Sequence, residues 1–218
     1  MAVRDYFSAA DLTAVKEATR EAESRTSGEF VCVIVERSDG FEDARWRAAA
    51  LGSLIGGLLA AYGFYALEAW EPAFFIWPAV MPFAGMAVGW LAAIAVPPIE
   101  RELAGGEALR SRVHNRAAAA FVDESVFRTR DRTGILIFVS LFERRVEILC
   151  DEGVRDKVPG EAWLGITRVL AAALGDGRGG AALTAAIKAC GDVVEEAGLE
   201  RREDDVNELP DEPRVGDE

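Results

Sequence analysis

The chain has 218 residues, of which 24 are Lys or Arg and 37 are Asp or Glu, so its formal net charge is −13. Because nucleic-acid binding needs a basic surface that neutralises phosphates, this charge argues against that class of function. The three cysteines lack CxxC spacing and lie among apolar residues. This pattern argues against a zinc or dithiol redox site and indicates a reducing compartment.

Residues 1–39 predict a helix followed by a buried strand. Ser8 and Asp11 have the spacing of a capping box, in which each side chain bonds to the backbone N–H of the other residue. Apolar residues then recur at helical spacing as far as Ala22. The continuous apolar run from Phe30 to Val35 is rich in β-branched residues, which is typical of a strand covered on both faces.

Residues 46–99 predict a transmembrane hairpin. Residues 48–67 and 74–97 carry no charged side chain, and each stretch has the roughly 20 apolar residues needed to cross a hydrocarbon core as a helix. The alternative, a pair of buried helices in a soluble core, would normally leave polar residues on an outer face. Because a hairpin returns the chain to the side from which it entered, we expect both flanks in one compartment.

Basic residues flank the hairpin on the side of both termini. Short cytoplasmic segments are enriched in Lys and Arg, and the loop at residues 68–71 contains neither. Trp46 lies at the predicted inner boundary, whereas Trp70 and Trp77 lie near the outer one, as expected for an aromatic belt. We therefore expect both termini in the cytoplasm. The basic flanking residues are Arg37, Arg45, Arg47, Arg101, Arg110, Arg112 and Arg116.

Both predicted spans contain a GxxxG motif, formed by Gly52 and Gly56 in the first and by Gly85 and Gly89 in the second. Such spacing lets helix backbones approach closely in lipid. We expect these glycines to pack the two spans against each other, and homo-oligomerisation is the alternative. Neither span holds an Asp, Glu, Lys, Arg or His residue, so the spans indicate an anchor and not a transport pathway.

Residues 107–198 predict the rest of the soluble domain. A helix, two strands joined tightly around Glu143 and Arg144, and two further helices follow one another. With the first helix and strand, this order predicts an α/β fold in which a small mixed sheet is flanked by helices. Residues 199–218 are strongly acidic and lack apolar periodicity, so we expect a disordered tail. Two alternatives stay open for its segment 207–211, NELPD: it docks back onto the domain, or it presents a linear peptide to a partner.

Residues 133–151, TGILIFVSLFERRVEILCD, resemble the central motif of the TPM domain. This superfamily includes thylakoid-lumen proteins, photosystem II repair proteins and bacterial envelope proteins, and the resemblance is strongest to a bacterial membrane-protein branch with an internal pair of spans. It implies a small α/β sandwich, interrupted by the hairpin, in the bacterial inner membrane. The matching residues are Gly134, Ser140, Glu143, Arg144, Asp151, Trp163, Asn207, Glu208, Leu209, Pro210 and Asp211.

Two pairs of acidic residues are candidate ligands for Ca²⁺ or Mg²⁺, which favour oxygen donors in flexible loops. Asp151 and Glu152 follow the second strand of the predicted β-hairpin, where metal-binding TPM relatives gather carboxylates. Asp123 and Glu124, late in the preceding helix, could complete the site. The alternative is that these are solvated charges at the ends of elements, with Asp151 capping a turn.

The sequence favours an interaction module over an enzyme. His114 is the only histidine, and no nucleophile motif accompanies it, so no catalytic residues are assigned. The TPM resemblance implies assembly or accessory roles for some relatives and acid phosphatase or calcium-binding activity for others. We therefore expect a membrane-anchored, cytoplasm-facing accessory domain whose partners are the lipid bilayer and a membrane protein. The alternative is a metal-dependent, phosphatase-like enzyme.

Overall fold

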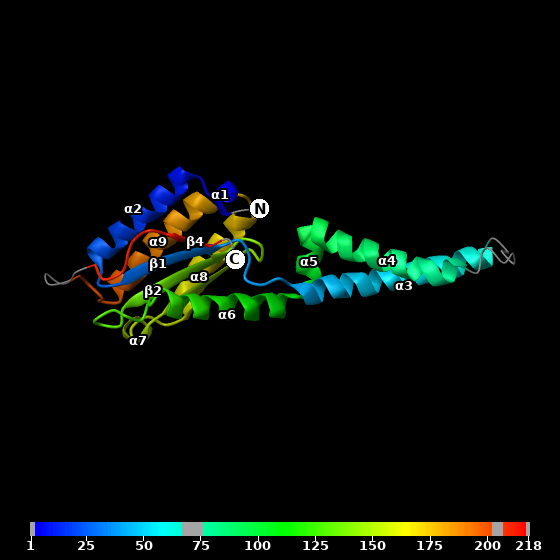
Figure 1. Ribbon diagram of the computed structural model, residues 1–218. Helices are drawn as coiled ribbons and strands as arrows, with labels where there is room; N and C mark the ends of the chain where they lie inside the picture. Colours follow the sequence, from blue (N-terminus) through cyan, green and yellow to red (C-terminus); the bar gives the residue numbers. More distant parts are fainter. Residues whose placement is uncertain (1–2, 67–75, 202–206, 217–218) are drawn as a thin grey trace. The chain divides into compact units, whose positions relative to one another are not determined.

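The computed structural model describes residues 3–66, 76–201 and 207–216. The chain forms two compact units. Residues 1–39 and 110–218 make up the first, which we call the α/β unit, and residues 40–109 make up the second, the hairpin unit. The α/β unit is therefore assembled from a chain segment that precedes the hairpin unit in the sequence and one that follows it (Figure 1).

A four-stranded mixed sheet forms the centre of the α/β unit. Its strands are β1 (Glu29–Val35), β2 (Gly134–Ser140), β3 (Arg145–Cys150) and β4 (Arg214–Gly216), in the order β3-β2-β1-β4. β1 pairs in parallel with both β2 and β4, and β2 pairs antiparallel with β3. Every residue of β1 and β2 is buried, which confirms the prediction of a central strand covered on both faces.

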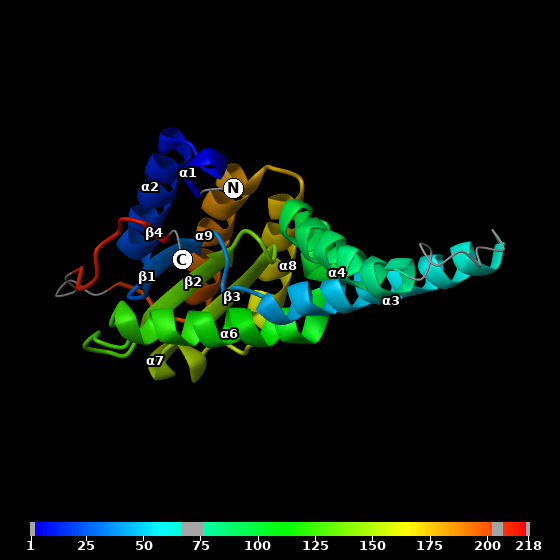
Figure 2. The same cartoon turned by 45° about the vertical axis from the view of Figure 1, so that its right-hand side comes forward.

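Helices cover both faces of this sheet (Figure 2). α2 (Ala9–Arg25), α8 (Glu161–Gly175) and α9 (Gly179–Glu196) pack on one face, and α6 (Gly106–Asp123) packs on the other. The alternation of side chains along β1 divides the core accordingly. Phe30, Cys32 and Ile34 belong to the cluster with α2, α8 and α9, whereas Val31, Val33 and Val35 belong to the cluster with α6.

Two local predictions in the α/β unit are confirmed. The Ser8 side chain accepts a hydrogen bond from the Asp11 N–H at 3.1 Å, and Asp11 accepts one from the Ser8 N–H at 2.9 Å, which completes the capping box of α2. β2 and β3 form the predicted hairpin, with Arg144 at a positive φ of 51° in its turn. The short helices α1 (Val3–Tyr6) and α7 (Glu152–Arg155) complete the unit.

The hairpin unit contains α3 (Glu42–Ala66), α4 (Trp77–Ala95) and α5 (Pro97–Ala104). α3 and α4 are long and apolar enough to cross a membrane. α3 begins six residues before the predicted span, so Trp46 lies within the helix. α4 ends at Ala95 because the prolines at positions 97 and 98 begin α5. The predicted loop, Trp70 and the outer end of each predicted span lie outside the described residues.

The glycines of both GxxxG motifs lie where α3 and α4 cross. A Cβ atom on Gly52 would collide with the backbone carbonyl of Gly85, and one on Gly89 would collide with that of Ala48. Gly56 makes the same close approach to Met81. The predicted packing of the two helices against each other is therefore confirmed. Their backbones are in direct contact at the glycines because no side chain separates them.

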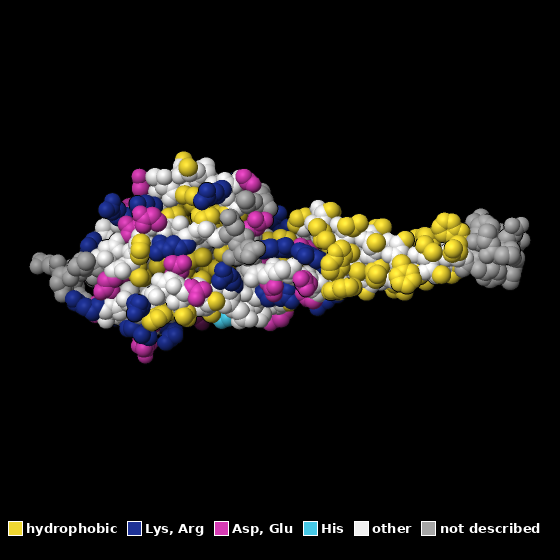
Figure 3. Space-filling model, in the orientation of Figure 1, with side chains coloured by type: hydrophobic (Ala, Val, Ile, Leu, Met, Phe, Trp, Pro, Cys, Tyr) yellow, Lys and Arg dark blue, Asp and Glu magenta, His cyan; other side chains and the backbone are white. Residues whose placement is uncertain are grey.

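Beyond the contact between α3 and α4, the surface of α4 and of α3 after Arg47 is rich in exposed apolar side chains (Figure 3). Tyr65 is 82% exposed and Phe83 is 69% exposed. A core helix of a soluble protein buries its large apolar residues, and these helices do not. The large apolar side chains exposed on them are Trp46, Leu51, Leu54, Ile55, Leu58, Leu59, Tyr62, Tyr65, Trp77, Val80, Phe83, Met86, Val88, Leu91 and Ile94.

The C-terminal segment corrects a prediction. Residues 199–218 were expected to be disordered, but residues 207–216 lie against the α/β unit and end in β4, which pairs with β1. Leu209 is 8% exposed in the core cluster beneath α6, and Val215 packs against the opposite cluster. The acidic composition of the tail predicts disorder. The sequence does not reveal β4, because a strand of three residues that pairs with a distant strand leaves no local pattern.

Candidate functional site

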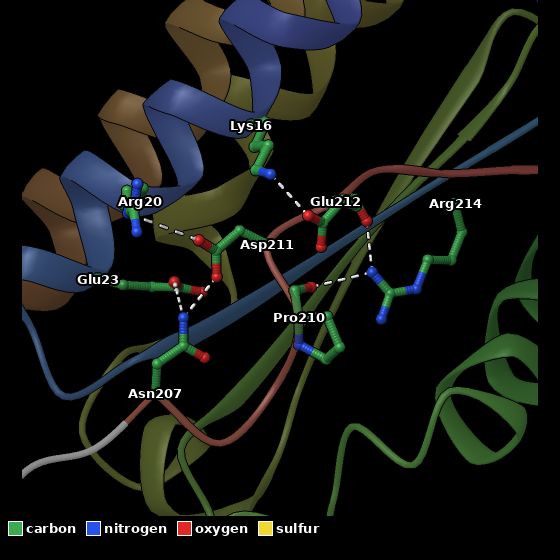
Figure 4. Close-up of polar contacts among 8 residues, drawn as sticks. All are labelled: Lys16, Arg20, Glu23, Asn207, Pro210, Asp211, Glu212 and Arg214. Atoms are coloured by element: carbon green, nitrogen blue, oxygen red, sulfur yellow. Dashed lines mark hydrogen bonds and ion pairs between the residues drawn. The ribbon is translucent and has the colours of Figure 1, made fainter.

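The docked C-terminal segment brings the tail motif into contact with α2 and β1 (Figure 4). The amide of Asn207 donates to Glu23 Oε2 at 3.4 Å and also bonds to Asp211. Lys16 forms an ion pair with Glu212 at 2.6 Å, and Arg20 lies 3.9 Å from Asp211. The negative charges of the tail are therefore met by basic residues one helical turn apart on α2.

Two buried carboxyl groups hold this segment in place. Glu23 and Glu29 are each 7% exposed. Glu23 Oε1 accepts a hydrogen bond from the Phe30 N–H at 2.9 Å, and Glu29 Oε2 accepts one from the Leu209 N–H at 3.2 Å. The sequence did not single out Glu23, because a glutamate within a helix usually lies on its solvated face.

Burial is the main reason that the pKa of Glu23 is raised, to about 9. The hydrogen bond from the Phe30 N–H opposes this shift, while the charges of Glu29 and Asp211 add to it. Glu23 is therefore protonated at neutral pH, and it forms a hydrogen bond with Asp211. A proton is thus part of the contact between α2 and the tail.

Substituting Glu23→Gln is expected to flatten the dependence of stability on pH. An unfolded glutamate ionises near pH 4.3, so folding takes up a proton at Glu23 between that pH and about 9. The stabilisation is fully present below the unfolded pKa and is lost as pH rises through the folded pKa, by at most about 1.4 kcal/mol per pH unit. Glutamine cannot ionise, so the variant should exceed the natural chain in stability above neutral pH.

Urea unfolding in detergent between pH 5 and pH 9, followed by circular dichroism, measures this effect. Glu17→Gln is the matched control, because Glu17 is an exposed glutamate on the same helix. The control should keep the slope of the natural chain. An equal slope in Glu23→Gln would show that Glu23 is ionised in the folded protein.

A second polar cluster lies where β1 and β2 end, and it contains Ser140 and Glu143 of the segment 133–151. The hydroxyl of Ser140, which is fully buried, donates to Glu143 Oε2. The Ser38 N–H donates to Glu143 Oε1 at 2.8 Å, and the two serine hydroxyls lie 3.1 Å apart. Burial raises the pKa of Glu143, and the bonds from Ser140 and Ser38 oppose that shift. Both carboxylate oxygens of Glu143 thus accept hydrogen bonds from residues at the ends of β1 and β2.

The candidate metal ligands have other partners or are exposed. Asp151 caps α7, accepting the Glu152 N–H at 2.8 Å, and its other oxygen lies 3.0 Å from Arg132 Nε in an ion pair that falls outside hydrogen-bond alignment. Glu124 pairs with Arg214 at 2.9 Å. The side chains of Asp123 and Glu152 are exposed.

Across residues 3–66, 76–201 and 207–216, no three His, Cys, Asp or Glu side chains are grouped to hold a metal ion. The alternative role for Asp151, capping a turn, is the one that the structure shows. The Ca²⁺ or Mg²⁺ site therefore stays a prediction, without a group of ligands to support it.

Other singled-out residues have structural roles. His114 on α6 lies 2.9 Å from Glu147 on β3, and Trp163 is buried in the core. Cys32, Cys150 and Cys190 are free thiols. Burial raises the pKa of the thiols of Cys32 and Cys150 to about 12, so they are poor nucleophiles.

The predicted membrane-boundary residues are engaged within the hairpin unit. Arg45 forms an ion pair at 2.8 Å with Glu100, a buried residue that the sequence did not single out. Arg47 donates to the carbonyl of Leu103 at 2.7 Å. Both contacts hold α5 against the beginning of α3. Trp46 packs edge-on against Trp90, with ring centroids 4.9 Å apart.

Comparison with known proteins adds one solved structure. No family model matches the chain, and no curated protein matches it. The NMR structure of the BA42 protein from the psychrophilic bacterium Bizionia argentinensis aligns with a TM-score of 0.59 and 17% sequence identity, covering 98% of each chain. At this identity the similarity shows the fold alone. The chain therefore shares the fold of that bacterial protein.

Proposed function

We propose that this protein is a TPM-like membrane protein, anchored by α3 and α4, whose α/β unit acts in the cytoplasm as an interaction or accessory module of a membrane complex. The exposed apolar surface of the two helices carries the proposal. Leaving such side chains in water forgoes about 25 cal/mol for each Å² of apolar surface. A lipid environment removes that cost.

The dimensions of the helices support insertion. At 1.5 Å per residue, the 25 residues of α3 extend for about 37 Å and the 19 residues of α4 for about 28 Å. A hydrocarbon core is about 30 Å thick. Neither the part of α3 after Arg47 nor any part of α4 carries a charged residue, so both match the chemistry of that core.

Strand pairing supports a common compartment for the two halves of the α/β unit. β1 precedes the hairpin, β2 follows it, and the two pair in register over seven residues. The chain must therefore cross the membrane an even number of times between them. The basic flanks favour the cytoplasm as that compartment.

The chemistry of the α/β unit supports an accessory role. Three residues of the TPM-like motif have structural roles. The buried hydroxyl of Ser140 bonds to Glu143, and Trp163 is buried in the core. β3 is an edge strand, and an edge strand offers backbone groups to a partner strand. Leu164 and Val169 expose apolar side chains on the neighbouring α8. These features suit binding of another protein.

Reporter fusions test the anchoring. Cells carrying a cytoplasm-active reporter on either terminus should give activity in both cases, and the protein should remain in the membrane fraction after alkaline carbonate washing. A matched variant that places arginine in the centre of α4, Ala87→Arg, should weaken membrane retention. Activity in opposite compartments, or a natural chain that remains soluble without detergent, would contradict the proposal.

Photocrosslinking in native membranes tests the accessory role. A photoreactive amino acid at Val169, which is 70% exposed, should capture a discrete membrane-protein partner. The same group at Glu17, an exposed position on α2, is the control and should not. Efficient turnover of a phosphate ester by the purified protein, together with no specific adduct at Val169, would favour the enzyme alternative.

A further inference from the structure

We propose that the groove between α3 and α4 binds one acyl chain of a membrane phospholipid, whose phosphate lies at the α5 end of the groove. This inference rests on the proposed membrane insertion of the hairpin. The groove has a volume of about 430 Å³. That volume falls within the range of about 300 to 1,000 Å³ that is typical of small-molecule sites.

The groove is built for an apolar chain. Leu51, Ile55 and Leu59 of α3 form one wall, Ala84 and Val88 of α4 form part of the other, and Ile99 of α5 lies at one end. No charged side chain lines it. A flexible hydrocarbon chain can follow such walls, and it brings no polar group that would need a partner.

The lining of the groove is uneven. Gly and Ala make up seven of its fourteen lining residues, and the other seven have large apolar side chains. The glycines are in backbone contact with the opposite helix, whereas Leu51, Ile55 and Val88 beside them are each at least 49% exposed. A flexible acyl chain can fill such an uneven surface, and the basic charge described next favours a phospholipid over a second copy of the helices.

Basic charge lies at the end of the groove where a headgroup would sit. Leu103 of α5 lines that end, and the Arg47 guanidinium donates to its carbonyl at 2.7 Å. The Arg47 side chain is 54% exposed, although Asp43 lies 3.4 Å from it. A phosphate next to this guanidinium would be bound by charge-assisted hydrogen bonds. The geometry thus favours an anionic phospholipid.

Two alanines of α4 provide a matched test. Ala84 lines the groove and Ala87 does not, and both are exposed. Ala84→Trp should fill the groove, whereas Ala87→Trp adds the same ring to the outer surface. After gentle detergent extraction, native mass spectrometry should show one bound phospholipid in the natural chain and in Ala87→Trp. The fraction of Ala84→Trp that carries lipid should be about tenfold lower, a change of about 1.4 kcal/mol.

A second pair keeps the test valid if Ala84→Trp fails to form the hairpin. Val88→Trp fills the groove from the next turn, and Leu91→Trp is its exposed control outside the groove. Helix content by circular dichroism confirms that each variant is folded. Arg47→Gln, measured in nanodiscs of phosphatidylglycerol and of phosphatidylcholine, should lose the preference for the anionic lipid.

The outcomes separate this inference from the proposed function. A membrane-embedded protein that carries no lipid, or the same lipid in all four tryptophan variants, would overturn the groove site and leave the anchoring intact. Groove-filling variants that dissociate a dimer would assign the groove to a second copy and also overturn it. A natural chain that is soluble without detergent would overturn the anchoring itself.

Discussion

Deleting residues 207–218 is expected to destabilise the α/β unit by about 3 to 5 kcal/mol. The deletion removes Leu209 from the core beneath α6 and removes the backbone pairing of β4 with β1. It also strips Glu29 of the Leu209 N–H. Because typical domains are stable by about 5 to 15 kcal/mol, the loss would be a large fraction of the whole. Urea unfolding in detergent, followed by circular dichroism, measures the shift.

Point variants separate packing from charge in this effect. Leu209→Ala should account for about 2 to 4 kcal/mol, because it leaves a cavity in a buried site. Glu208→Gln keeps the exposed oxygen that accepts the Arg130 N–H and should change stability by less than about 0.5 kcal/mol. If the truncated protein unfolded at the same urea concentration as the natural chain, the docked tail would contribute nothing to stability.

Replacing Gly85 by leucine is expected to force α3 and α4 apart. The new Cβ would collide with the carbonyl of Gly52, and that backbone atom cannot move without shifting the helix. Overpacking of this kind costs about 1 to 3 kcal/mol or more. The thermal unfolding midpoint in detergent should fall, and the near-ultraviolet circular dichroism of the Trp46–Trp90 pair should weaken.

Gly63→Leu is the matched control. A Cβ on Gly63 has no neighbouring atom within 4 Å, so the same bulk enters open space on α3. Gly63 lies within α3, where leucine has a higher helix propensity than glycine, so the substitution should not weaken the helix. A loss in Gly63→Leu equal to that in Gly85→Leu would show that the crossing is not the cause.

The two glycine motifs illustrate how far sequence reasoning reaches into the hairpin. Spacing alone predicted that Gly52, Gly56, Gly85 and Gly89 would pack the helices together, because residues four apart share a helix face. The collision of each missing Cβ with the opposite backbone bears this out. The groove that these glycines partly line could not be predicted, since its walls depend on how α3, α4 and α5 meet.

In the candidate site, by contrast, the sequence indicated few of the contacts that the structure shows. The tail motif was recognised from the sequence, but its contact with Glu23 was not. Glu23 lies seven residues before Phe30 and more than 180 residues before Asn207, so no local pattern connects the three. Likewise, the sequence did not predict the ion pairs of Asp151 with Arg132 and of Glu124 with Arg214.

Features that depend on near neighbours in the chain could be predicted from the sequence. The capping box at Ser8, the buried run of β1, the turn at Arg144 and the two long apolar stretches are all set by local periodicity and side-chain chemistry. The sheet order, the docking of the tail and the raised pKa of Glu23 could be seen only in the folded chain. The reason is that pairing, burial and charge proximity arise between segments that the chain brings together only when it folds.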